Sequence, residues 1–327
     1  MWQIIEENKR KSWFLFFSLG AIMLTMGYVF GFYYGDYEGG TFGLIMAMGL
    51  WLILSTVAYF QGDNIMLAVA GAKEVTSENY PQLYNIVEEM KIAGNLPALP
   101  KIYIIEDQNL NAFATGIRPE KSAVAITRGL LEKLNRDEIQ GVMAHEVGHI
   151  INRDVLFMTL AGIMIGCIAM MSDMFWRNHL WGGGRKKSSS NNDSKGEGAL
   201  VVVAVVLAIL APIFARILYF AASKKREYLA DAEAVRLTRN PLGLALALEK
   251  ISLAPVNKKN INQVVAPLYI VNPLANLEAD SLFTTHPPVK NRIKILKTLS
   301  SDVDYHAYQN AYNQQLGNKD VLIKTKD

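Results

Sequence analysis

Three residues in one short segment, His145, Glu146 and His149, have the types and spacing of a metal-dependent hydrolytic site. Residues four apart lie on one face of a helix, so both imidazoles can bind one metal ion. Glu146 projects beside them, where its carboxylate can take a proton from a metal-bound water. Zinc lowers the pKa of such a water to about 7 and polarises a carbonyl group. The segment therefore predicts one zinc ion per chain and hydrolysis of peptide bonds.

The alternative for this segment is a helix with two solvated histidines. Gly148 argues against that alternative. A glycine inside a helix costs up to about 1 kcal/mol relative to alanine. Its presence indicates that another group approaches the helix closely at this position.

A catalytic zinc ion has three protein ligands, and the third does not come from the same segment. A third histidine would need glycine and histidine where Asn152 and Val155 stand. The better candidate is Glu227. Asp231 follows one helical turn later and can accept a hydrogen bond from a ligating imidazole, which fixes the orientation of the ring. The alternative is a solvated helix on which Glu227 pairs with a neighbouring lysine.

Long apolar runs indicate a membrane protein. Residues 12–35 and 39–62 contain no charged residue. A helix of about 24 residues is about 36 Å long, enough to cross a hydrocarbon core. Two shorter runs, 155–172 and 198–215, are near the lower limit of about 17 residues for spanning. For this second pair the alternative is a buried core hairpin.

The charges next to these runs predict the orientation. Basic residues at 9–11 precede the first run, and the loop after it carries Asp36 and Glu38 but no lysine or arginine. The positive-inside rule then places the N-terminus in the cytoplasm. An even number of crossings separates His149 from Glu227, so both are expected at the cytoplasmic face. The basic residues of the 177–198 loop do not fit this orientation, but the strongly biased first hairpin is expected to dominate.

Composition argues against several other classes of protein. The net charge of +3 is too small to indicate a nucleic-acid partner. A single cysteine, Cys167, excludes an intramolecular disulfide and is not expected to bind zinc. The apolar runs lack charged residues apart from Asp173 and Arg216 near two ends, which argues against a transporter or channel. Basic clusters beside the apolar runs favour lipid headgroups of the bilayer as their partners.

A soluble stretch follows the first two apolar runs. Short strands are predicted at 101–105, 112–115 and 123–126, and the helix with the two histidines is expected to begin at Asp137. Residues Asn111, Ala112 and Phe113 begin the middle strand. We expect an edge strand to which an extended substrate adds by main-chain hydrogen bonds, with the Asn111 side chain setting the register. The alternative is an ordinary hairpin strand that starts with a polar residue.

Together these motifs resemble the HtpX family of bacterial membrane metalloproteases, which are relatives of the CAAX prenyl proteases. The resemblance covers nearly the whole chain and rests on the order and spacing of the N-terminal hairpin, residues 111–116, 145–154, 226–231 and 285–288, and Arg292 with Ile293. It implies that Glu227 is the third zinc ligand and that Asp231 orients the ligands. It further implies cleavage of damaged or misfolded membrane proteins at the cytoplasmic side of the bacterial inner membrane. The 177–198 loop is longer than is usual in the family.

His286 and Arg292 lie in the last of these motifs. His286 precedes two prolines, which suit the start of a helix. It is a candidate to hydrogen-bond the oxyanion of a tetrahedral intermediate, and the alternative is a structural or surface histidine. Arg292 is expected to be a helix-surface or scaffold residue and not a catalyst.

We therefore expect a mostly α-helical membrane protein with four membrane-inserted helices and a zincin-type α+β catalytic domain that contains a small sheet. The expected parts are an N-terminal transmembrane hairpin at 1–62, the first half of the catalytic domain at 63–154, a second hairpin at 155–221 and the second half of the catalytic domain at 222–327. Expected substrates are unfolded or misfolded membrane proteins. Two alternatives stand beside this function: a zinc-binding membrane scaffold without proteolytic activity, and a CAAX-type processing protease.

Overall fold

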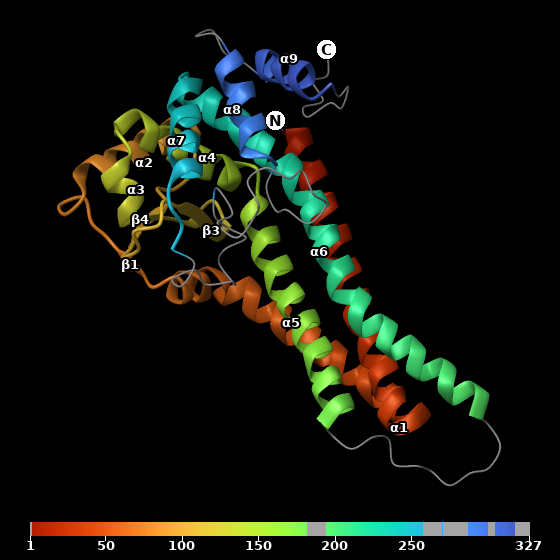
Figure 1. Ribbon diagram of the computed structural model, residues 1–327. Coiled ribbons are helices and arrows are strands. Elements are labelled where there is room, and N and C mark those ends of the chain that lie inside the picture. Colours follow the sequence, from red (N-terminus) through yellow and green to blue (C-terminus); the bar gives the residue numbers. More distant parts are fainter. Residues whose placement is uncertain (1, 182–193, 258–269, 271–286, 300–304, 318–327) are drawn as a thin grey trace. The chain divides into compact units, whose positions relative to one another are not determined.

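The computed structural model describes residues 2–181, 194–257, 270, 287–299 and 305–317 (Figure 1). The chain forms two compact units, each of which contains segments far apart in the sequence. The first unit comprises residues 1–11, 60–159 and 220–327, and the second comprises residues 12–59 and 160–219. The long helices α1 (Trp2–Val69), α5 (Asp154–Trp181) and α6 (Ser194–Thr238) contribute residues to both units.

Within the second unit, α1 folds back on itself at Gly35 and Asp36, whose backbone angles are not helical. Glycines allow the two halves to pack closely. A Cβ atom added to Gly31 would lie 2.2 Å from the carbonyl oxygen of Gly39, and one added to Gly27 would lie 2.4 Å from the Cβ of Ala47. Small residues at such a contact are typical of helices that associate in a membrane.

Two helical segments of the described residues are long and apolar enough to cross a membrane: Ser12–Val69 and Leu160–Leu180. The helix Val201–Ala215 is apolar but shorter. The break at Gly35 and Asp36 divides the first segment close to the predicted boundary between 12–35 and 39–62. The expectation of four membrane-inserted helices stays a prediction.

The first unit contains a small mixed sheet of four strands. They are β1 (Ala72–Glu74), β2 (Lys101–Ile105), β3 (Ala112–Arg118) and β4 (Lys121–Thr127), in the order β1-β2-β4-β3. Strands β2 and β4 are parallel, and the other two pairs are antiparallel. The three predicted strands are present, and β3 is an edge strand as expected. Sequence analysis missed β1, because three residues are too few for a recognisable alternation.

The remaining helices of the first unit are α2 (Pro81–Ala93), α3 (Arg128–Lys133), α4 (Arg136–Ile151), α7 (Pro241–Leu253), α8 (Val289–Thr298) and α9 (Tyr305–Leu316). Helix α4 lies at the centre of this unit and contacts α2, α7 and the edge strand β3 (Figure 1). It is buried on nearly all sides, so it shows little amphipathic character.

Capping fixes the first residues of α4. The Asn135 side chain accepts a hydrogen bond from the Glu138 backbone, and the Glu138 carboxylate accepts one from the Asn135 backbone. Lys250 of α7 lies 2.7 Å from the same carboxylate of Glu138. These contacts satisfy backbone groups that a helix terminus leaves without partners.

Gly148 confirms the expected close approach to α4. A Cβ atom at this position would lie 3.0 Å from the Cβ of Glu233 and 3.2 Å from the carbonyl oxygen of Ala230, both in α6. The missing side chain therefore allows α6 to pack directly against the helix that carries His145 and His149.

Replacing Gly148 by alanine is expected to push α6 away from α4. We expect Gly148→Ala to lower the free energy of unfolding by about 1–3 kcal/mol, as overpacking of a tight contact does. Denaturation of the detergent-purified protein, followed by circular dichroism, measures the change. Gly162→Ala in α5 is the matched control, because a Cβ atom there has no described neighbour within 4 Å. Equal stability of the two variants would contradict this account of the packing.

Candidate metal centre

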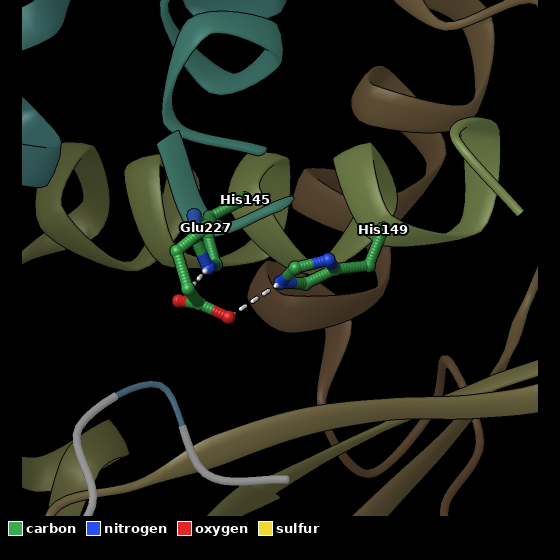
Figure 2. A group of neighbouring side chains, drawn as sticks. All are labelled: His145, His149 and Glu227. Atoms are coloured by element: carbon green, nitrogen blue, oxygen red, sulfur yellow. Dashed lines mark ion pairs between the residues drawn. The ribbon is translucent and has the colours of Figure 1, made fainter. Parts of the chain in front are cut away.

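Two helices bring three possible ligands together in the first unit. His145 and His149 project from α4, and Glu227 projects toward them from α6 (Figure 2). Each imidazole Nε2 lies 3.5 Å from a carboxylate oxygen of Glu227, and the three ligand atoms all lie within 4.8 Å of one another. All three residues are buried.

The two 3.5 Å separations between Glu227 and the imidazoles fit ligands of one metal ion better than direct hydrogen bonds. Zinc holds nitrogen and oxygen ligands at about 2.0–2.2 Å, and a tetrahedron of that size separates them by about 3.3–3.6 Å. The Nε2 atom of His145 is fully buried and has no hydrogen-bond partner among the described residues. Leaving such an atom unsatisfied costs about 1–3 kcal/mol, and metal coordination would remove that cost.

A buried carboxylate and an arginine hold the ring of His145. Its Nδ1 lies 2.9 Å from Asp231, one turn after Glu227 on α6. Arg292 of α8 donates to both oxygens of Asp231, at 2.7 and 2.8 Å. Burial alone would raise the pKa of Asp231, but the charge of Arg292 and the hydrogen bond to His145 lower it. Asp231 is therefore held ionised as an acceptor for the imidazole.

A buried carboxylate and an arginine also hold the ring of His149. Its Nδ1 lies 3.3 Å from Asp154, and Arg226 lies 3.1 Å from the other oxygen of that carboxylate. Arg153 adopts a left-handed backbone conformation (φ 60°) between α4 and α5, which turns the chain so that Asp154 returns to His149. Burial alone would lower the pKa of His149, but Asp154 and Glu227 raise it to about 10. A metal ion would have to displace the proton that these carboxylates favour.

The charges of the site suit a divalent cation. Glu146, Asp154, Glu227 and Asp231 are buried carboxylates, and Arg226 and Arg292 are buried guanidiniums. If these six groups are ionised and both imidazoles are neutral, as metal ligands are, four negative and two positive charges leave an excess of two negative charges. Two positive charges at the centre would balance them, because buried charges are stable only when they are paired or bind a metal.

Glu146 lies between the ligands and the sheet. Its carboxylate is buried and accepts a hydrogen bond from the backbone of Ala114 in β3. Burial raises the pKa of Glu146, and the neighbouring histidines and the Ala114 hydrogen bond only partly oppose this effect. A carboxylate with a raised pKa is suited to accept and return a proton near neutral pH.

Comparison with known sequences agrees with this geometry. The sequence model of Peptidase family M48 matches residues 77–300, which include the three possible ligands and Glu146. The chain belongs to peptidase family M48. It is accordingly a metallopeptidase, and the resemblance to HtpX proteases is confirmed.

Several relatives are similar over nearly their whole length. A "Protease HtpX homolog" of Dictyoglomus turgidum is 43% identical over 300 residues, which cover 91% of this chain and 94% of the relative. A "Protease HtpX homolog" of Streptococcus gordonii is 38% identical over 300 residues, which cover 91% of this chain and 100% of the relative. The crystal structure of S. mikatae Ste24p aligns with a TM-score of 0.44 at 19% identity, covering 90% of this chain and 67% of that one. A structural similarity this low supports no conclusion about the activity of this chain.

The structure brings most of the predicted site residues of this M48 peptidase together. His145, His149, Glu227 and Asp231 form one cluster, and Asn111, Ala112 and Phe113 lie at the start of the edge strand near it. His286 lies outside the described residues. Arg292 is expected to be a helix-surface or scaffold residue, and the surface alternative is wrong, because this side chain is fully buried against Asp231.

Sequence analysis missed Asp154 and Arg226 as site residues. Both belong to motifs that were recognised, since Asp154 ends the 145–154 segment and Arg226 begins the 226–231 segment. Their roles depend on the turn after α4 and on the direction in which α6 approaches. A sequence pattern of helical spacing shows neither feature.

We expect Asp154→Asn to reduce the affinity for zinc about 10–100-fold, because a neutral amide holds and polarises the ligating imidazole less well. Chelator competition with the purified protein measures this affinity. Asp137→Asn is the matched control, since Asp137 is an exposed residue in the first turn of the same helix. An unchanged affinity in Asp154→Asn would mean that Asp154 serves only to pair with Arg226.

Proposed function

We propose that this M48 peptidase is a zinc-dependent endopeptidase at the cytoplasmic face of a bacterial cell membrane. Its proposed substrates are unfolded or misfolded membrane proteins, which it would hydrolyse at peptide bonds as part of protein quality control. The observation that carries the proposal is the buried cluster of His145, His149 and Glu227 with the Glu146 carboxylate beside it. A metal-binding scaffold without activity has no need for a base in that position.

In this proposal His145, His149 and Glu227 hold one zinc ion. Bound there, zinc supplies a water of lowered pKa and polarises the carbonyl group of the substrate. Asp231 and Asp154 keep each imidazole in the tautomer that presents Nε2 to the ion. Arg292 and Arg226 in turn hold these two carboxylates in place by buried ion pairs.

Glu146 is the proposed general base and then the general acid. It takes a proton from the attacking water and returns it to the nitrogen of the leaving amine. Its raised pKa, caused by burial, favours both transfers near neutral pH. We further propose that His286 donates a hydrogen bond to the oxyanion.

The edge strand β3 is the proposed support for the substrate backbone. Asn111, Ala112 and Phe113 open this strand, and the backbone of Ala114 contacts Glu146. An extended peptide added beside β3 would run past the catalytic carboxylate. Main-chain hydrogen bonds of this kind bind many sequences, which suits an enzyme for unfolded proteins.

Chain connectivity supports a site near the membrane surface. His149 precedes the apolar segment Leu160–Leu180 by about three helical turns. Glu227 follows the apolar helix Val201–Ala215 by a similar distance. The positive residues before the first apolar run favour the cytoplasmic side for both.

Glu146→Gln is expected to abolish hydrolysis while zinc stays bound. Glutamine has the size of glutamate but accepts no proton, so the loss should be at least about 100-fold. Degradation of an unfolded model protein by detergent-purified enzyme, together with zinc content, provides the test. Glu132→Gln in α3 changes an exposed glutamate and serves as the control. Retained hydrolysis by Glu146→Gln would falsify the proposed role of Glu146.

Removal of the metal should stop hydrolysis and weaken the fold. Without the ion, Nε2 of His145 stays buried and unsatisfied. We expect a chelator to abolish activity and lower the Tm, and added zinc to restore both. Activity that survives complete removal of the metal, verified by elemental analysis, would contradict zinc-dependent hydrolysis.

A further inference from the structure

The tip of the hairpin formed by β3 and β4 packs against the junction between α4 and α5. A small open hollow lies at this contact, within the first unit. Its lining includes Arg118, Pro119 and Ser122 of the hairpin and Ile150, Arg153 and Val155 of the junction. Two of these side chains are cationic and three are apolar, so the hollow suits a ligand that has both an anionic and an apolar part.

Arg153 is the cation of this hollow that lacks a counter-ion. Its side chain is partly buried, and within the described part of the chain its guanidinium makes no hydrogen bond or ion pair. The adjacent carboxylate of Asp154 pairs with Arg226 instead, at 3.1 Å. A partly buried charge without a partner is unfavourable, so an anion bound from outside the chain would stabilise this arrangement.

The charges around Arg153 also favour an anion. Arg118 and Lys121 face each other across the hairpin tip, and both are exposed. Glu120, between them in sequence, is the acidic residue of the tip. Together with Arg153, the tip and the junction carry three positive charges and one negative charge, apart from the paired Asp154.

The hollow lies where α5 leaves the first unit. The segment Leu160–Leu180 of this helix is long and apolar enough to cross a membrane. Arg153 precedes Leu160 by seven residues, about 10 Å along a helix. The headgroup layer on each side of a bilayer is about 5–8 Å thick, so the long side chain of Arg153 reaches it when this segment is in the membrane. Anionic headgroups attract basic side chains at this depth.

We infer that Arg153 and Arg118 bind the phosphate group of an anionic phospholipid, whose glycerol and first acyl carbons contact Ile150 and Val155. The guanidinium fork matches two phosphate oxygens. The apolar lining matches the start of an acyl chain, which a soluble phosphate lacks. The ligand is therefore a lipid and not a free anion.

A lipid at this position would act on the metal centre through one backbone turn. Arg153 has a left-handed backbone conformation (φ 60°), which is unfavourable for residues other than glycine. The next residue, Asp154, lies 3.3 Å from Nδ1 of His149. A phosphate that holds Arg153 therefore stabilises the turn that keeps Asp154 at the imidazole. This link rests on the proposed function, because it concerns the same metal centre.

Native mass spectrometry of the full chain in a non-ionic detergent tests the lipid site without requiring hydrolysis. The probe is dioctanoyl-phosphatidylglycerol, and the zwitterionic dioctanoyl-phosphatidylcholine is the comparison. We expect the Kd of the first bound lipid to be at least about fivefold lower for phosphatidylglycerol. Arg153→Gln and Arg118→Gln should each raise this Kd about fivefold, because each removes one cation from the headgroup. Arg153→Lys keeps the charge and should retain most of the affinity.

The matched control is Arg239→Gln. Arg239 is also a left-handed arginine between two helices (φ 53°), but it follows α6 at the end remote from the apolar helix Val201–Ala215. Its variant should bind phosphatidylglycerol like the wild type. Tm and zinc content verify that all variants are folded.

Three results would overturn the lipid site. These are equal affinity of the wild type for both lipids, unchanged affinity in both glutamine variants, and displacement of phosphatidylglycerol by equimolar inorganic phosphate. The last result would show that a soluble anion fills the hollow as well as a lipid does.

Zinc affinity in nanodiscs tests the link to the metal centre. We expect the wild type to bind zinc at least about fivefold more tightly in nanodiscs that contain phosphatidylglycerol than in phosphatidylcholine alone. Arg153→Gly should show no such difference, because glycine adopts the left-handed turn without a ligand. A zinc affinity of the wild type that is independent of the lipid would overturn the link.

Failure of this inference and failure of the proposed function are distinguishable. Lipid binding and lipid-dependent zinc affinity as expected, without hydrolysis of an unfolded protein, would refute only the proposed function. Hydrolysis with no preference for phosphatidylglycerol would refute only the lipid site.

Discussion

The direct contact between α4 and α6 at Gly148 is the constraint on which the site depends. A side chain at this position would force Ala230 and Glu233 to shift by a few tenths of an ångström away from the helix with the two histidines. Their close approach accompanies that of Glu227, one turn before Ala230, which lies 3.5 Å from both imidazoles. The candidate metal centre is thus a consequence of helix packing, and its possible third ligand lies on a helix about 80 residues later in the chain.

Burial gives the site its chemistry but also requires charge compensation. The same low-dielectric surroundings that raise the pKa of Glu146 make isolated charges costly. Two buried ion pairs, Asp231 with Arg292 and Asp154 with Arg226, meet this requirement by pairing each carboxylate with a guanidinium. A lost partner would leave a buried charge uncompensated, which destabilises a protein more than the pair itself stabilises it. Catalytic tuning and fold stability therefore depend on the same few contacts.

The edge strand β3 packs against the helix that carries this centre. Its inner face belongs to the apolar core of the first unit, while its outward backbone groups contact Glu146 and Ile270. Arg292 contacts a ligand-holding carboxylate and the Ile270 carbonyl with one guanidinium. One guanidinium therefore connects the carboxylate beside His145 to the backbone of Ile270.

The sequence by itself determined the chemistry of the centre and much of the local structure. Helical spacing identified His145, Glu146 and His149, alternation and turn residues identified three strands, and the mid-helix Gly148 indicated a close neighbour. It left Glu227 open between a ligand and a solvated residue until the resemblance was considered. The roles of Asp154 and Arg226, the burial of Arg292 and the position of Ile270 were decided only by the tertiary structure. Local periodicity reports which residues share a face of one element, whereas these contacts depend on how separate elements pack.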